Sequence, residues 1–106
     1  MQVLFRTDGD ILTVFLSGDI DHHTSKEIRE AIDGEMQRLM PKELILDFHN
    51  VHFMDSSGVG LVMGRYKTAQ VYGCRVCVCE MPKNVEKIMT MSGLGKIITL
   101  KKEGTV

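Results

Sequence analysis

Two serines follow an acid and precede spaced glycines in the segment FMDSSGVG, residues 53–60. A serine hydroxyl can act as a nucleophile beside an oriented base, can accept a phosphoryl group from another enzyme, or can cap a helix. The chain has four histidines that could supply a base: His22, His23, His49 and His52. The G-x-S-x-G elbow of serine hydrolases is absent, because Met54 and Asp55 stand two positions before the serines. Hydrolysis is therefore disfavoured, and the histidines are interpreted as ordinary loop residues.

Three glycines, Gly58, Gly60 and Gly64, match a nucleotide-binding pattern only loosely. Their spacing, G-x-G-x-x-x-G, is one residue longer than the dinucleotide fingerprint, and no G-x-x-x-x-G-K-[ST] sequence occurs. Each glycine also costs a helix about 1 kcal/mol. We interpret them as a helix face that lets another backbone approach closely, whether that of the sheet beneath or that of a docked protein.

Two segments contain residue types that bind metals. Cys74, Cys77 and Cys79 form C-x-x-C-x-C, and residues 19–23 form D-x-D-H-H. A structural zinc site needs four converging ligands, and the cysteines lack a second ligand pair. They fall on an expected strand, where thiols behave as small buried hydrophobes. Residues 19–23 are interpreted as a capped loop, and no metal or other cofactor is expected.

Phosphorylation by another enzyme fits the position of Ser56 and Ser57 at the start of an expected helix. A helix N-terminus offers unpaired N–H groups and the positive end of the helix dipole, which favour a phosphate. Asp55 is adjacent, and Asp21 can approach from the neighbouring loop. The same position also suits a serine that only caps the helix. The residues alone leave these two interpretations open.

The composition favours one small domain without a nucleic acid or membrane partner. The chain has 106 residues, with 13 basic and 14 acidic side chains scattered along it. No block of like charge could follow a phosphate backbone or an anionic membrane. No apolar run approaches the roughly 18 residues that span a bilayer, and the start has no signal-peptide pattern. We expect a cytoplasmic protein, a location that also suits free cysteines.

The hydrophobic periodicity predicts a single α/β domain over residues 1–106 with the element order ββαβαβαβ. The expected strands cover residues 3–5, 11–16, 43–48, 75–80 and 96–101, and the expected helices run from 24 to 40, 57 to 72 and 82 to 91. TDGD predicts a hairpin between the first two strands, Thr24 and Glu27 predict a capping box, and residues 49–57 are expected to form a loop. Strands that alternate with helices predict a mostly parallel sheet with an N-terminal antiparallel hairpin and packed helices. Functional residues of such sheets gather outside the carboxyl ends of the strands.

Several segments resemble those of one known family. They are GDIDHHT at 18–24, FMDSSGVG at 53–60, GRYK at 64–67 and MSGLGKII at 91–98. Together they resemble the anti-sigma factor antagonists of the sporulation sigma F type, which belong to the STAS domain family. The resemblance covers nearly the whole chain in the same order and spacing. D-S-S-G combined with G-R-Y-K is more specific than any motif considered above.

The resemblance implies a small α/β switch protein that is not an enzyme. Its partner would be an anti-sigma factor that is also a serine kinase with bound ATP or ADP, and the unphosphorylated protein would displace the sigma factor from it. Phosphorylation of Ser57 would switch binding off, and a serine phosphatase would reverse the modification. Antagonists of this family serve both sporulation and general stress responses, so the identity of the controlled sigma factor stays open.

The resemblance also implies which residues form the site. Ser57 is the acceptor, as the second serine of D-S-S-G, and Asp21, Asp55 and Ser56 lie near it. The implied partner-binding residues are Asp21, Met54, Ser56, Ser57, Gly58, Val59, Gly60 and Arg65. No catalytic residue is expected in this chain, because the kinase brings ATP, Mg²⁺ and the base that accepts the hydroxyl proton.

Overall fold

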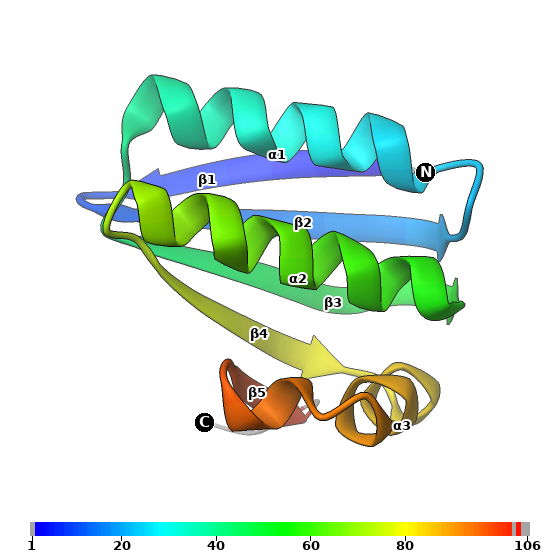
Figure 1. Cartoon of the computed structure of the whole chain (residues 1–106). Coiled ribbons are helices and arrows are strands. Elements are labelled where there is room, and N and C mark those ends of the chain that lie inside the picture. Colours follow the sequence, from blue (N-terminus) through cyan, green and yellow to red (C-terminus); the bar gives the residue numbers. More distant parts are fainter. Residues whose placement is uncertain (1, 103, 105–106) are drawn as a thin grey trace.

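Five strands form one sheet in the same order as they occur in the chain (Figure 1). The computed structural model describes residues 2–102 and 104. The strands are β1 (Gln2–Asp8), β2 (Ile11–Ile20), β3 (Glu43–Met54), β4 (Arg75–Met81) and β5 (Thr99–Lys102). The helices are α1 (Ser25–Leu39), α2 (Ser56–Val71), α3 (Lys83–Met91) and the short 3₁₀ helix η1 (Leu94–Lys96). β1 and β2 are antiparallel and the later pairs are parallel, which confirms the predicted α/β fold.

A tight turn joins β1 to β2. Asp8 pairs with Ile11, so that only Gly9 and Asp10 connect the two strands. Gly9 has a φ of +59°, a conformation that glycine adopts without the steric cost of a side chain. The predicted hairpin is therefore confirmed, and its strands are longer than the apolar runs alone indicated.

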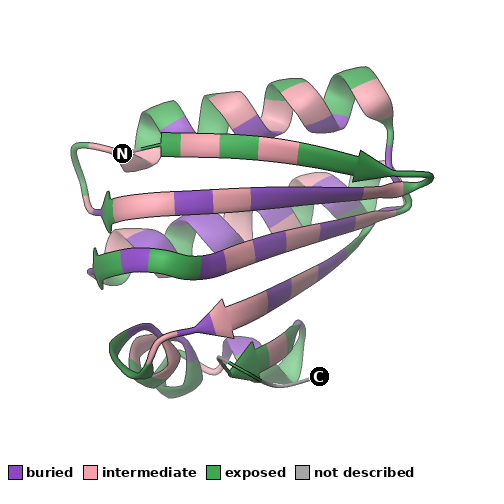
Figure 2. Cartoon of the chain, turned by 180° about the vertical axis from the view of Figure 1, so that it is seen from behind, coloured by how far each residue is buried: buried purple, intermediate pink, exposed green. Residues whose placement is uncertain are grey.

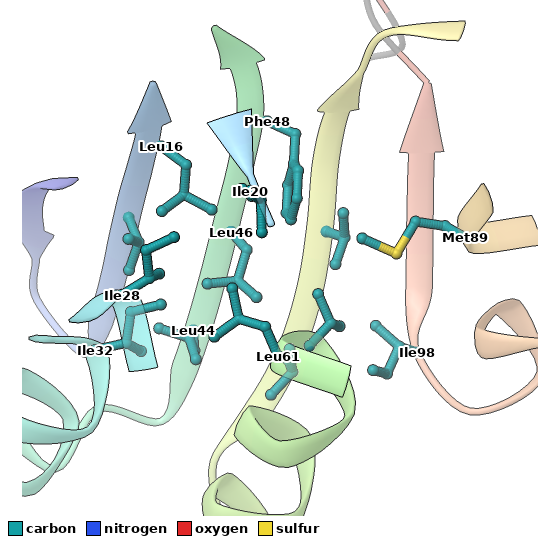
Figure 3. Packing of buried hydrophobic residues seen from close by; sticks show 14 of the residues in the cluster. Leu16, Ile20, Ile28, Ile32, Leu44, Leu46, Phe48, Leu61, Met89 and Ile98 are labelled. Atoms are coloured by element: carbon teal, nitrogen blue, oxygen red, sulfur yellow. The ribbon is translucent and has the colours of Figure 1, made fainter. Parts of the chain in front are cut away.

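The two longer helices cover one face of the sheet. α1 and α2 lie on this face in Figure 1, and the view from behind in Figure 2 shows β1 to β4 with no helix in front of them. α1 buries Ile28, Ile32 and Met36, whose spacing of four places them on one side of the helix. No helix of the described residues is both long and apolar enough to cross a membrane. The core lies between the helices and the sheet, and the side chains labelled in Figure 3 include Leu16, Ile20, Leu44, Leu46, Phe48, Leu61 and Met89.

β3 continues beyond the predicted strand. Residues 49–54 were expected to form part of a loop, but they pair with the second half of β2, up to Ile20 opposite Met54. β4 pairs only with the first half of β3, so the extension has a neighbouring strand on one side. The interpretation of the histidines as loop residues is therefore wrong for His49 and His52, which lie on this strand.

The capping box predicted for α1 does not form. Thr24 precedes the helix, but its side chain makes no capping hydrogen bond, so the pairing with Glu27 is wrong. The Thr24 hydroxyl instead donates to the carbonyl oxygen of Asp19 at 2.9 Å and accepts from the Asp21 N–H at 3.1 Å. It therefore stabilises the turn between β2 and α1.

The last strand is shorter than predicted. Residues 94–96 form η1, so β5 begins at Thr99 and not at residue 96. Helix α3 also begins slightly later than predicted, because Pro82 lies at its N-cap and not in its first turn. These differences are confined to the C-terminal third and leave the strand order unchanged.

Phe48 and Phe53 lie on the same strand with opposite burial, at 0% and 50% exposed. We expect Phe48→Ala to lower the free energy of unfolding by about 3–5 kcal/mol, because it leaves a cavity in the core. Phe53→Ala is the matched control and should cost no more than about 1 kcal/mol. Urea unfolding followed by circular dichroism measures both. Equal losses of unfolding free energy would contradict the buried position of Phe48 and the exposed position of Phe53.

Candidate functional site

The carboxyl ends of β2 and β3 meet at one end of the sheet. Ile20 pairs with Met54, and the Asp55 N–H donates to the Ile20 carbonyl oxygen at 3.1 Å. This contact brings the turn that begins at Asp21 next to the segment that contains Ser57. α1 and α2 both begin at this end of the sheet (Figure 1). The structure thus brings together the two segments that the sequence predicted as a site.

Asp55 caps α2, and neither serine does. Its carboxylate Oδ1 accepts a hydrogen bond from the Ser57 N–H at 2.8 Å, and its carbonyl oxygen accepts from the Gly58 N–H at 3.0 Å. α2 therefore begins at Ser56, and the interpretation of Ser56 or Ser57 as the cap is wrong. Within the described residues the Ser57 hydroxyl makes no hydrogen bond. This half-buried hydroxyl is left available for chemistry.

An open cavity of about 650 Å³ lies beside the first turns of α1 and α2. Ser57 lines it together with residues of the turn before α1 and of both helices. The other lining residues are His22, His23, Ser25, Lys26, Arg29, Gly60, Leu61, Gly64 and Arg65. None of them is an aspartate or a glutamate, so the lining is basic.

His22 and His23 share this cavity with Ser57. Among the described residues, neither imidazole forms a hydrogen bond with the Ser57 hydroxyl. A serine nucleophile needs an oriented base within hydrogen-bond reach. The geometry therefore offers no preformed serine–histidine pair.

Asp21 organises the turn before α1. Its Oδ1 accepts hydrogen bonds from the N–H groups of His23 at 2.8 Å and Thr24 at 3.1 Å. Burial acts to raise the pKa of Asp21, but the two N–H bonds and the neighbouring His23 ring lower it overall. Strand pairing places Asp21 at the same end of the sheet as Ser57. In the part of the chain that the structure describes, no hydrogen bond joins the two side chains.

Arg65, which the resemblance assigns to partner binding, is buried and only 4% exposed. Its Nε lies 2.8 Å from Oδ1 of Asp33 in α1. The N–H is not aligned for a hydrogen bond, so the contact is an ion pair. Burial lowers the pKa of Arg65, an effect that Asp33 opposes and Arg29 reinforces. Arg65 therefore links α2 to α1 and can reach another molecule only through the cavity that it lines.

Gly58 and Met54 pack closely at the start of α2. A Cβ at Gly58 would collide with Cγ and Sδ of Met54, which is 4% exposed. Met54 thus supports the helix from the core, and very little of its side chain is exposed. Gly60 and Gly64 line the cavity, and apart from the adjacent residues and the helix's own backbone no described atom lies within 4 Å of a Cβ built on either. A docked backbone could approach α2 along these two glycines.

The cysteine cluster lies away from the cavity lining. Cys74, Cys77 and Cys79 are free thiols, and burial raises the pKa of each, that of Cys79 to about 12. Such thiols stay protonated and unreactive at neutral pH. No three His, Cys, Asp or Glu side chains among the described residues gather as metal ligands.

Sequence reasoning missed the basic residues of α1. Lys26 and Arg29 line the cavity with Ser57, and Asp33 pairs with Arg65. A spacing of three or four residues puts such side chains on one side of a helix. The sequence shows this spacing, but only the packing of the helices shows that this side of α1 faces α2.

The family model of the STAS domain matches residues 2–104, so the chain belongs to the STAS domain family. Among curated relatives, the anti-sigma F factor antagonist of Paenibacillus polymyxa is 38% identical over 94% of this chain and 86% of that protein. The anti-sigma-B factor antagonist of Listeria monocytogenes is 27% identical over 89% of this chain and 82% of that protein.

Two solved structures of SpoIIAA have the same fold. The anti-sigma factor antagonist SpoIIAA in its unphosphorylated form superposes with a TM-score of 0.81, at 29% identity, and the match covers 96% of this chain and 90% of that one. The Bacillus cell fate determinant SpoIIAA in the phosphorylated form gives a TM-score of 0.73 at 28% identity, covering 96% and 93%. The fold of SpoIIAA is therefore known in both the unphosphorylated and the phosphorylated form.

The packing of Gly58 against Met54 yields a test of the site's architecture. We expect Gly58→Ala to lower the free energy of unfolding by about 1–3 kcal/mol, because the new methyl group displaces a buried side chain. In Gly60→Ala, two residues later in the same helix, the new methyl group meets no neighbour. This variant should raise the free energy of unfolding by at most about 1 kcal/mol, because alanine has the higher helix propensity. Urea unfolding compares the two variants. A stabilised Gly58→Ala would show that Met54 does not fill the space beneath the helix.

Proposed function

We propose that this protein is an anti-sigma factor antagonist that is switched by phosphorylation of Ser57. The unphosphorylated form binds an anti-sigma factor that is itself a serine kinase, and this binding releases the sigma factor. The observation that carries the proposal is the Ser57 hydroxyl, which lines an open cavity at the start of α2 and makes no hydrogen bond with any described residue. The names of the curated relatives support the antagonist role.

The kinase supplies the catalytic groups, and this chain supplies the acceptor. Oγ of Ser57 attacks the γ-phosphorus of ATP, the bond to ADP breaks, and the hydroxyl proton passes to a base of the kinase. A serine phosphatase later hydrolyses the phosphate ester. The chain therefore needs no catalytic residue and no cofactor of its own, and it is not an enzyme.

The proposed docking surface surrounds the start of α2. Ser56 and Gly60 are exposed there and Val59 is half-buried. Asp21 and Asp55 add negative charge, and their hydrogen bonds to backbone N–H groups fix where each carboxylate lies. An anti-sigma factor with a basic group at the matching position would complement this surface.

The controlled process in this proposal is transcription of the sporulation type. The relative that is 38% identical is an anti-sigma F factor antagonist, whereas an anti-sigma-B factor antagonist is 27% identical. A general stress response is therefore the second candidate. Either role places the chain in the cytoplasm with ATP and RNA polymerase. A pull-down from native lysate with unphosphorylated protein, followed by mass spectrometry, identifies which anti-sigma factor binds.

We expect Ser57→Ala to fold normally, to bind the anti-sigma partner and to accept no phosphate. The cap of α2 is Asp55, so loss of the Ser57 hydroxyl should cost less than the roughly 0.5–2 kcal/mol of a lost cap. Intact-mass spectrometry after incubation with kinase and ATP measures the modification, and Ser56→Ala is the matched control that should still gain one phosphate. A phosphate on Ser57→Ala but not on Ser56→Ala would transfer the acceptor role to Ser56.

Phosphorylation should act on docking and leave the fold intact. A charge of about −1.5 to −2 at a helix N-terminus is neutral to mildly stabilising within the monomer. In the docked state the same charge would be buried near Asp21 and Asp55, and if the partner brings no matching cation this costs several kcal/mol through desolvation and repulsion. The effect on binding therefore exceeds the effect on stability.

We predict that Ser57 phosphorylation shifts the melting temperature by only a few degrees but weakens partner binding more than a hundredfold, which corresponds to a loss of about 3 kcal/mol. Calorimetric melting and isothermal titration of both forms measure the two effects. Ser57→Asp should reproduce the loss of affinity only in part, because it carries one charge. Equal affinities, or a large fall in melting temperature, would rule out this mechanism.

A further inference from the structure

The cavity beside Ser57 is lined by basic residues on several sides. Lys26 and Arg29 reach it from α1, Arg65 from α2, and His22 and His23 from the turn between β2 and α1. Among the residues that the structure describes, no carboxylate lines it. A site with this arrangement of charge and open volume favours an anion.

Arg65 gives independent support for an anion. Its Nη1 is buried and has no hydrogen-bond partner in the part of the chain that the structure describes, while its Nε contacts Asp33 only as an ion pair. A buried donor without an acceptor costs free energy, and such groups are rare unless a water or ligand satisfies them. Arg29 is also close enough for its positive charge to lower the pKa of Arg65, in addition to the larger effect of burial.

The acids near Ser57 are already engaged. Asp55 accepts from the Ser57 N–H, Asp21 accepts from the N–H groups of its own turn, and Asp33 pairs with Arg65. A phosphoryl group on Ser57 would therefore find the nearest helix N–H occupied by a carboxylate. Its oxygens need other donors, and the basic side chains of the cavity are the ones available.

We propose that the cavity is a built-in site for the phosphoryl group on Ser57, held by Lys26 and Arg29 from α1 above the buried Arg65. This inference rests on the proposed phosphorylation of Ser57 and explains what the phosphate does afterwards. The modified side chain joins α2 to α1 and occupies the part of the cavity next to Ser57. Phosphorylation thus changes the charge and the shape of the docking surface from within the domain.

Phosphoserine placed at position 57 by genetic encoding tests this inference without a kinase. The ionisation of the phosphate is followed by phosphorus NMR, with a phosphoserine peptide of residues 53–60 as the reference. Nearby cations favour the dianion, so we expect the phosphate pKa in the folded protein to lie about one unit below that of the peptide. In the double variant Lys26→Gln, Arg29→Gln the pKa should rise most of the way back to the peptide value, because Arg65 is then the one Lys or Arg side chain left among the described residues that line the cavity.

The matched control is the double variant Arg38→Gln, Lys42→Gln. It removes the same charge from exposed residues that pair with Glu35 and Asp10 and do not line the cavity. This control should keep the lowered pKa. Lys26 and Arg29 are themselves exposed, so their substitution should not unfold the protein. The single variants Lys26→Gln and Arg29→Gln should each give part of the rise in the phosphate pKa.

A phosphate pKa equal to that of the peptide, or an identical rise in both double variants, would overturn the inference. Because the phosphoserine is installed without the kinase, these results leave the proposed function standing. A kinase that fails to modify Ser57 contradicts the proposed function alone.

Discussion

The parallel pairing of β2 with β3 out to their carboxyl ends is the constraint on which the site depends. Ile20 lies opposite Met54, and the Asp55 N–H extends the ladder by one more bond to the Ile20 carbonyl oxygen. This register fixes where the turn at Asp21 and the start of α2 meet. A slip of one residue would turn buried Met54 outward and separate the acceptor segment from the turn.

Neighbouring residues at the start of α2 have different roles. Asp55 satisfies the helix N-terminus, which leaves the hydroxyl of Ser57 without a structural role. Met54 fills the space beneath Gly58, which holds the first turn against the core. A modification at Ser57 can therefore change the charge of the surface without removing a contact that the fold needs.

The sequence predicted the elements of the fold correctly where one physical signal dominated. Asp-Gly between apolar runs predicted the hairpin, and alternating strands and helices predicted the parallel sheet. The extension of β3 was missed because exposed residues such as His49 and His52 break the apolar pattern, and only pairing with β2 makes this segment a strand. The cap was misassigned because Asp55 and both serines are all good capping residues, and only the backbone geometry selects one. The basic cavity depends on two helices from distant segments, so local patterns could not reveal it.

The central claim is that partner docking occurs at the end of the sheet where α1 and α2 begin. An amide NMR shift map of the unphosphorylated protein with its anti-sigma partner tests this claim directly. The account predicts the largest shifts within residues 21–29 and 53–60. The sheet face without a helix, where Phe15, Ile45 and Cys77 are half-buried, should change little. Shifts concentrated on that face, with the start of α2 unaffected, would contradict the account.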